Sequence, residues 1–302
     1  MRLVTLLTVV SGVLLSACAM GSKPSPELTM SAVLEASTPD DWRRTDPNLT
    51  LYMTLPGGTV IIELAPDFAP AHTKNILTLV DQRYFDGLAI VRSQENYVVQ
   101  WGDPAEADKK RSLGQAKSKL DGEYFRAASG LDFTRLNTRD SYANEVGFVD
   151  GFPAGRDDAN GRAWLAHCNA MLGAGRDVAA DSGNGQELYV VIGHAPRHLD
   201  RNVTLVGRVI DGMQHLSTLP RGTGSLGFYE TAAERTSILS IRRESQLADD
   251  KRQHLELLRT DTETFKQLIQ ARQHRLEEWF IDPAGQIGLC NVPLPVRAIA
   301  NP

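Results

Sequence analysis

The chain has 302 residues, of which 42% are hydrophobic and 23% are charged, and its formal net charge at pH 7 is -5. These values are typical of a globular protein that is long enough to bury one sizeable core. The net negative charge argues against nucleic acid as a partner.

The first 17 residues have the layout of a signal peptide, with Arg2, an apolar run from Leu3 to Leu15 and small residues before Cys18. The run is too short to span a membrane. The four residues ending in Cys18 resemble the lipobox of bacterial lipoproteins, whose cysteine becomes the lipidated first residue. The sequence favours this interpretation over an ordinary secretory signal, and Ala19 is consistent with outer-membrane sorting. We therefore expect a periplasmic protein, lipid-anchored through Cys18, in the outer membrane.

Residues 18–47 are polar, lack a sustained period and carry four prolines, namely Pro24, Pro26, Pro39 and Pro47. This composition predicts a flexible tether. The main domain is expected over residues 48–247, and it opens with alternating residues 48–55, a Pro-Gly-Gly turn and a second apolar run, the pattern of an antiparallel hairpin. Pro70 is placed to begin a helix that carries Ile76, Leu77 and Val80 on one face.

The stretch "AIVRSQENYVVQWGDP", residues 89–104, reads as a mostly buried strand that carries Arg92 and Gln100. Because side chains of a strand repeat every two residues, positions eight apart share one face, and we expect both to line one groove. Tyr97 shares that face only if a turn or bulge between Ser93 and Asn96 resets the alternation. The alternative for Arg92 is an ordinary surface ion pair.

Further strand-like runs follow, such as "ELYVVIG" and "VTLVGRVIDGM", separated by clusters of Gly, Asp and Asn. So many antiparallel strands with few helices predict a mainly β protein, a closed antiparallel barrel with capping helices. Residues 141–164 are rich in glycine and aspartate, and we expect them to form a long loop that wraps the domain or rims the groove.

The order of segments "GGTVIIEL…AP…NILTLV…YFDG…VR…NYVVQWGDP", followed by "GQELYVVIG" and "HLDRNVTLVGRVIDGM", resembles that of cyclophilin-type peptidyl-prolyl cis-trans isomerases. The resemblance covers residues 48–247. It implies a cyclophilin-like β-barrel, proline-containing polypeptide segments as substrates, and isomerisation of Xaa-Pro bonds in protein folding, without a metal or cofactor.

The reaction itself explains which residues such a site needs. Rotation of an Xaa-Pro amide has a barrier of about 18–20 kcal/mol because its C–N bond has partial double-bond character. An apolar slot for the proline ring and a fixed cation that favours the twisted amide are sufficient to lower it. The resemblance makes Arg92 this catalytic cation, and assigns substrate binding to Tyr97, Val98, Gln100, Glu187, Tyr189, His198 and Leu199.

Tyr97 and Val98 replace the usual Phe and Met of the family's pocket. The chain also departs from the family pattern on the opposite wall and beside Arg92: Val91 stands for His, Glu187 for Gln, Tyr189 for Phe, His198 for Trp and Val203 for His. Glu187 is expected either to pair with Arg92 in the empty groove or to be solvated. These changes affect the expected rate more than the fold. They leave open a catalytically weak cyclophilin-like module that binds peptides or acts as a chaperone, and more remotely a purely structural barrel.

Other motifs carry less information. The run "GTGSLG", residues 222–227, matches a dinucleotide-binding pattern, but it follows Pro220 and Arg221 rather than a strand, and we interpret it as a loop. His167 and Cys168 are adjacent, and adjacent side chains of a strand point to opposite faces. The seven histidines of the chain also show no spacing typical of metal ligands, so we expect no metal site.

Residues 248–302 are expected to form a helical extension and tail. The run "TDTE" at Thr260–Glu263 reads as a capping box. It is followed by an amphipathic stripe formed by Phe265, Leu268, Ile269, Leu276, Trp279 and Phe280. We expect this stripe to dock on the barrel, and the alternative is a contact with a partner or a second copy of the chain. After Cys18, two cysteines remain, Cys168 and Cys290, and the sequence leaves open whether they form a disulfide or stay as two buried thiols.

Overall fold

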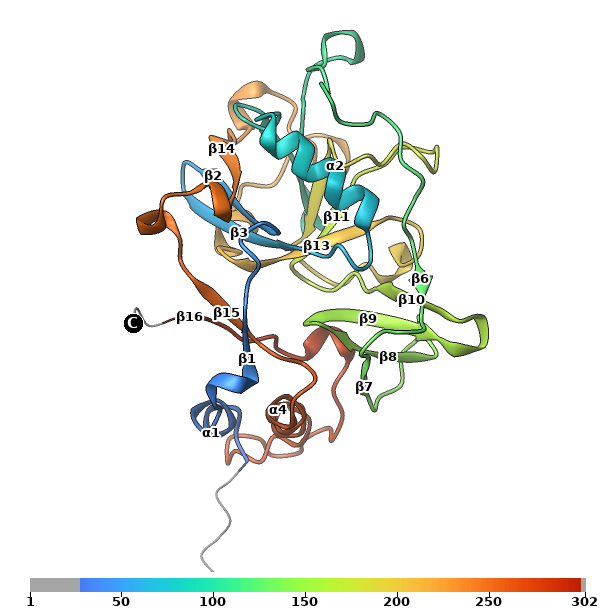
Figure 1. The fold of residues 1–302 in the computed structure, drawn as a ribbon, viewed down its shortest axis with the longest axis vertical. Helices are drawn as coiled ribbons and strands as arrows, with labels where there is room; N and C mark the ends of the chain where they lie inside the picture. Colours follow the sequence, from blue (N-terminus) through green and yellow to red (C-terminus); the bar gives the residue numbers. More distant parts are fainter. Residues whose placement is uncertain (1–27, 300–302) are drawn as a thin grey trace, which may run out of the picture.

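The structure is a computed structural model that describes residues 28–299 (Figure 1). The predicted signal peptide, Cys18 and the first part of the predicted tether lie outside the described residues. The described part is mainly β, as predicted, and within it the helices are too short or too polar to cross a bilayer.

The larger part of the molecule is a curled sheet of eight antiparallel strands in the upper half of Figure 1. In spatial order these are β14 (Ser240–Arg243), β2 (Thr50–Leu55), β3 (Gly58–Leu64), β13 (Leu205–Asp211), β11 (Met171–Ala174), β12 (Leu188–Val191), β5 (Val98–Gly102) and β4 (Ala89–Ser93).

This sheet is not the closed barrel that the sequence predicts. Its ladder ends at β14 on one side and β4 on the other, and isolated bridges from Ala89 to Ser237 and from Arg92 to Phe228 join β4 to the returning chain. Irregular turns precede Ser240, so the returning chain pairs with β4 over only a few residues. By the regular pairing of its strands, the sheet is therefore a curled half-barrel that stays open between β14 and β4.

The predicted hairpin and the helix that follows it are confirmed. Strands β2 and β3 pair from Thr50–Glu63 to Leu55–Gly58. Helix α2 (Pro70–Asp81) has proline in its first turn, where a missing N–H removes no helical bond. It buries Ile76, Leu79 and Val80 in the core of the curled sheet. A short helix, α3 (Gln214–Ser217), follows β13.

Residues 89–104 form a hairpin rather than one strand. Strands β4 and β5 are antiparallel, and the turn between them contains Asn96 with φ of 53°. Arg92 lies directly opposite Gln100, after a register shift between Ile90 and Arg92. Along a single strand the two would be about 26 Å apart. They share a site because the chain reverses between them. The prediction that both line one groove is therefore confirmed, but its reason, a shared face of one strand, was wrong.

A second, five-stranded sheet lies below the curled sheet in Figure 1. Its order is β6 (Arg126–Ala127), β10 (Arg162–Leu165), β9 (Phe152–Asp157), β8 (Glu145–Val149) and β7 (Thr134–Leu136). Three of these strands lie in the segment that we expected to be a loop, so that prediction was wrong. Asp150 and Gly151 both have positive φ, 46° and 80°, which is the geometry of a two-residue hairpin turn. The glycine and aspartate residues that favoured a loop lie largely in and beside the turns between these short strands.

The predicted flexible tether is wrong for its described part. Helix α1 (Met30–Glu35) begins after the N-cap Thr29, and β1 (Trp42–Arg44) pairs with β15 (Leu255–Leu258) in a three-stranded sheet completed by β16 (Val296–Ala298). Val33 and Trp42 are buried in a second core, which contains residues of the five-stranded sheet. Burial of these two side chains against C-terminal residues holds the segment in place. The proline-rich composition of residues 18–47 gives no sign of this contact.

The C-terminal helix α4 (Glu263–His274) buries Phe265, Leu268 and Ile269. Its N-cap is Thr262, whose hydroxyl accepts from the Phe265 N–H, whereas the hydroxyl of Thr260 accepts from Gly151 N–H at 3.1 Å. The predicted cap is therefore two residues too early. The helix packs in the second core, beside α1, and Phe265 contacts Phe148 edge to face.

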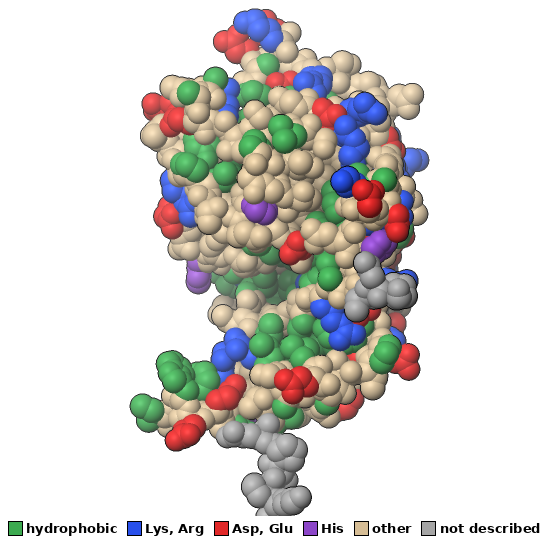
Figure 2. All heavy atoms as spheres, turned by 90° about the vertical axis from the view of Figure 1, so that its left-hand side faces the viewer, with side chains coloured by type: hydrophobic (Ala, Val, Ile, Leu, Met, Phe, Trp, Pro, Cys, Tyr) green, Lys and Arg blue, Asp and Glu red, His purple; other side chains and the backbone are tan. Residues whose placement is uncertain are grey.

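The predicted apolar stripe is longer than the helix. Arg275 adopts a left-handed conformation, with φ of 51°, which ends α4. Leu276 and Trp279 therefore lie beyond it and are 53% and 82% exposed. Hydrophobic side chains are visible at the tip of the lower part of the molecule in Figure 2.

Cys168 and Cys290 form a disulfide with a Cα–Cα distance of 5.0 Å. It joins the segment between β10 and β11 to the tail, which settles the alternative that the sequence left open.

Short 3-10 helices complete the described elements: η1 (Pro39–Asp41), η2 (Ala107–Lys109), η3 (Asp158–Asn160), η4 (Arg197–Leu199), η5 (Ser225–Gly227), η6 (Ala232–Glu234), η7 (Glu244–Gln246), η8 (Asp249–Lys251) and η9 (Leu289–Asn291).

Candidate active site

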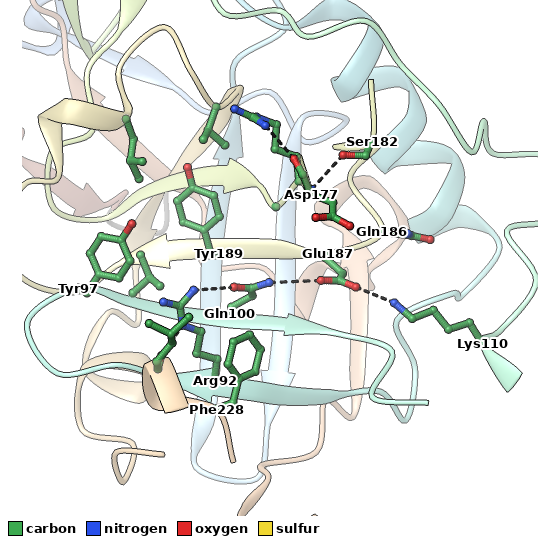
Figure 3. Close-up of a pocket in the computed structure, with 16 residues that line it drawn as sticks. Arg92, Tyr97, Gln100, Lys110, Asp177, Ser182, Gln186, Glu187, Tyr189 and Phe228 are labelled. Atoms are coloured by element: carbon green, nitrogen blue, oxygen red, sulfur yellow. Dashed lines mark hydrogen bonds and ion pairs between the residues drawn. The ribbon is translucent and has the colours of Figure 1, made fainter. Parts of the chain in front are cut away.

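A cavity of about 710 Å³ opens on the curled sheet and brings together most of the predicted site residues (Figure 3). Its size is that of an ordinary ligand site. Seven predicted residues line it: Arg92, Tyr97, Val98, Gln100, Glu187, Tyr189 and Leu199. The eighth, His198, is exposed and is not among the lining residues. Its place in η4, one residue before Leu199, leaves it outside the groove.

Arg92 extends from β4 and is half-buried, and its guanidinium is fixed on several sides. Its Nε donates to the carbonyl of Leu226 at 2.7 Å, and one terminal nitrogen donates to Gln94. The guanidinium carbon lies 5.4 Å from the ring centre of Tyr97 and 5.2 Å from that of Phe228. Burial lowers the pKa of Arg92 from its ordinary value, but a guanidinium remains charged at neutral pH. The site therefore holds an oriented cation.

A line of polar groups runs along the groove from this cation (Figure 3). Arg92 Nη1 donates to Gln100 Oε1 at 3.3 Å, and Gln100 Nε2 donates to Glu187 Oε2, also at 3.3 Å. Glu187 Oε1 pairs with Lys110 Nζ at 2.8 Å. The expected pair between Glu187 and Arg92 was thus wrong, because Gln100 lies between the two and Lys110 supplies the nearer cation.

The apolar part of the groove is formed by Val98 and Tyr189, which are buried together with Val191, and by Tyr97 and Val203, which pack against them. The turn at 94–97 resets the alternation, as the sequence required for Tyr97 to join the site. Burial raises the pKa of Tyr189, and its hydroxyl lies 2.8 Å from His167 Nε2. The departures at 189 and 203 therefore leave an apolar seat in place.

The sequence did not identify Lys110, Leu226 or Phe228 as site residues, although all three line the cavity. Lys110 lies in a segment that lacks a periodic pattern. Leu226 belongs to the run 222–227, which was interpreted as a loop, and Phe228 follows it directly. An isolated bridge pairs Arg92 with Phe228. Positions 134 or more residues after Arg92 give no local signal that they will contact it.

Replacing Gln100 with leucine is expected to lower kcat/KM for a proline-containing peptide about tenfold. The change removes the acceptor of Arg92 Nη1 and the donor to Glu187, and it replaces the amide with an apolar side chain of similar size. A protease-coupled isomerisation assay measures the effect. The matched control is Gln82→Leu, at an exposed position at the end of α2. Equal rates for Gln100→Leu and the wild type would contradict a role for Gln100.

The stability of the fold is expected to decrease as the pH falls below about 6.5. Burial lowers the pKa of His167, against the opposing effect of Asp200, while Arg197 and His198 act in the same direction as burial. In the unfolded chain the ordinary pKa is about 6.5. Below that pH the unfolded state binds a proton that the folded state does not, so the free energy of unfolding falls. Urea denaturation at about pH 7.5 and 5.5 measures the change in the free energy of unfolding. A His167→Gln variant should lack the part of this change that comes from His167.

Within residues 28–299, no group of three or more His, Cys, Asp or Glu side chains is arranged to hold a metal ion. His167 is buried and bonded to Asp200 and Tyr189, and Cys168 is in the disulfide. The two residues therefore have structural partners.

Comparison with known proteins identifies the family. Residues 50–242 match the model of the cyclophilin type peptidyl-prolyl cis-trans isomerase/CLD family. A probable peptidyl-prolyl cis-trans isomerase of Brucella suis is 24% identical over 196 residues, which are 65% of this chain and 81% of the relative. Peptidyl-prolyl cis-trans isomerase-like 2 of Gibberella zeae is 26% identical over 54% of this chain and 21% of its own length.

The crystal structure of the cyclophilin AquaCyp293 from Hirschia baltica has the same fold. It superposes with a TM-score of 0.66 at 24% identity, covering 90% of this chain and 99% of that one. Because the family model spans more than half of the chain and matches the curled sheet with its groove, this chain belongs to the cyclophilin-type peptidyl-prolyl cis-trans isomerases.

Proposed function

We propose that this chain accelerates Xaa-Pro isomerisation in extended segments of envelope proteins, with Arg92 as the catalytic cation. The observation that carries the proposal is the fixed guanidinium at the edge of an apolar seat, held by the Leu226 carbonyl and by Gln100. In the twisted transition state the prolyl nitrogen regains its lone pair, and a nearby donor stabilises that state more than the planar amide. Tyr97, Val98, Tyr189 and Leu199 supply the surface on which the proline ring binds.

The same proposal places the protein in the periplasm, lipid-anchored to the outer membrane through Cys18. It rests on the sequence of residues 1–18, which are outside the described structure. The disulfide supports this location, since such bonds persist in oxidising compartments. A Cys18→Ser variant is expected to appear in the soluble periplasmic fraction, whereas the wild type should label with palmitate and sediment with membranes.

An NMR exchange experiment on Xaa-Pro peptides tests the activity. Catalytic amounts of the protein should increase the cis-trans exchange rate well above the spontaneous rate. A peptide that is bound without any acceleration would contradict the proposal.

A second candidate is a binding module that keeps the groove but isomerises slowly. The Glu187–Lys110 pair favours it, because Glu187 stands where the family has an amide, and the ion pair changes the polarity of one end of the groove. Peptide binding without faster exchange, together with suppressed aggregation of an unfolded client, would select this function.

A further inference from the structure

A chain of buried polar groups connects the floor of the groove to the five-stranded sheet. The hydroxyl of Tyr189, on β12, lies 2.8 Å from His167 Nε2, and His167 Nδ1 lies 2.9 Å from Asp200 Oδ1. A carboxylate can only accept, so Nδ1 carries the imidazole proton and Nε2 accepts from the tyrosine. His167 is 0% exposed, and its backbone N–H also donates to Asp200 at 2.9 Å.

The chain continues from Asp200 into the second sheet. Arg197 Nε donates to Asp200 Oδ2 at 2.6 Å, and the two terminal nitrogens of Arg197 donate to Asp140 at 2.9 and 3.1 Å. Asp140 lies between β7 and β8, and His167 follows β10, so both belong to the five-stranded part of the chain. The bidentate pair is largely buried, which makes it more directional than a surface pair.

The position of the Tyr189 ring depends on this chain as well as on packing. The ring lies against Gly173 of β11, where a Cβ atom would come within 2.2 Å of its Cζ. Gly173 thus leaves the space that the hydroxyl end of the ring occupies, and His167 bonds the hydroxyl there. A buried hydroxyl without a partner is costly, so the ring would shift to find another acceptor if His167 could not accept.

We propose that His167 is a positioning residue for the groove: it fixes the Tyr189 ring as the seat for proline, and the five-stranded sheet, through Asp140, Arg197 and Asp200, fixes His167. This inference rests on the proposed function, since it assigns a role within the same site. It gives the second sheet a part in substrate recognition although none of its strand residues lines the cavity.

A comparison of two amides at position 167 tests the proposal. The amide of His167→Gln can place its oxygen near the position of Nε2 and accept from Tyr189, whereas that of His167→Asn can replace only the Nδ1 donor. We expect His167→Asn to lower kcat/KM about tenfold, and His167→Gln to stay within about threefold of the wild type. All variants are assayed at a temperature at which circular dichroism shows them folded.

The Tyr189→Phe background separates positioning from stability. Without the hydroxyl, His167→Asn should change kcat/KM less than about twofold, although it still lowers the melting temperature. If His167→Asn lowers the melting temperature but leaves kcat/KM unchanged in both backgrounds, the role is structural only and the proposal is overturned. An equal loss of kcat/KM in both backgrounds also overturns it, because the effect would not pass through Tyr189.

A second pair of variants tests the part of the five-stranded sheet. Asp140→Asn weakens the link to Arg197, and Asp132→Asn changes an exposed acid of the same sheet region. Asp140→Asn should lower kcat/KM about threefold, and only when Tyr189 is present, whereas Asp132→Asn should have no effect. Equal values for the two variants would remove the five-stranded sheet from the proposal.

Failure of the proposed function gives a different result. If the wild type does not accelerate exchange, the isomerase assignment falls, and the same cycle is then measured as the Kd of an Xaa-Pro peptide by NMR titration. Loss of affinity in His167→Asn but not in His167→Gln, and only when Tyr189 is present, supports the positioning role. Equal affinities for all variants overturn it.

Discussion

Replacing Arg92 with alanine is expected to lower kcat/KM for Xaa-Pro isomerisation by a factor of about 100 or more. The change removes the guanidinium that the Leu226 carbonyl, Gln94 and Gln100 hold in the groove. Loss of a preorganised donor to the charge that develops in a transition state typically costs about 10²–10³ in rate. Arg92→Lys should keep a small part of the rate, because an ammonium lacks the planar fork.

The control for this experiment is Arg44→Ala, an exposed arginine at the end of β1 that does not line the cavity. Both variants should retain the wild-type melting temperature within a few degrees, since neither side chain is fully buried. A folded Arg92→Ala variant with more than a third of the wild-type rate would exclude Arg92 as the catalytic cation.

Removal of the disulfide is the second large effect. The double variant Cys168→Ala/Cys290→Ala is expected to lose about 2–4 kcal/mol of unfolding free energy, because the bond closes a loop of 122 positions. The tail and α4 should become the first segments that a protease cuts, since the bond attaches the tail to the segment after β10. Urea denaturation and limited proteolysis measure the two effects.

Thiol titration of a Cys18→Ser variant, unfolded without reductant, provides the control. It should find no free thiol, because the remaining two cysteines are bonded to each other. Two reactive thiols would contradict the bond, and equal denaturation curves for the wild type and the double variant would contradict its contribution to stability.

Local patterns were sufficient for several elements of the fold. The period of two around Pro-Gly-Gly predicted the β2–β3 hairpin, and Pro70 with its apolar face predicted α2. Both depend on contacts between residues close in sequence, which the chain encodes directly. The order of segments also predicted the family and placed Arg92 in the groove.

Two of the predictions that were wrong concern residues whose partners are distant in sequence. Thr260 carried the pattern of an N-cap, but Gly151 competes for its hydroxyl, and Thr262 caps α4 instead. Residues 28–47 lacked a period, yet Trp42 and Val33 are buried against the C-terminal part of the chain. A hydrogen bond from a distant residue decides the first case, and in the second the apolar area buried between distant segments outweighs local propensity.

The sequence by itself determined the residue types of the site, namely a cation, an amide and apolar side chains in one short stretch, and the order of strands that carries them. Only the tertiary structure decided how they meet. The turn at Asn96 sets Arg92 opposite Gln100, and Lys110 rather than Arg92 neutralises Glu187. Hydrogen bonds and ion pairs depend on distances of a few ångströms between groups far apart in the chain, and these distances exist only once the sheet has curled.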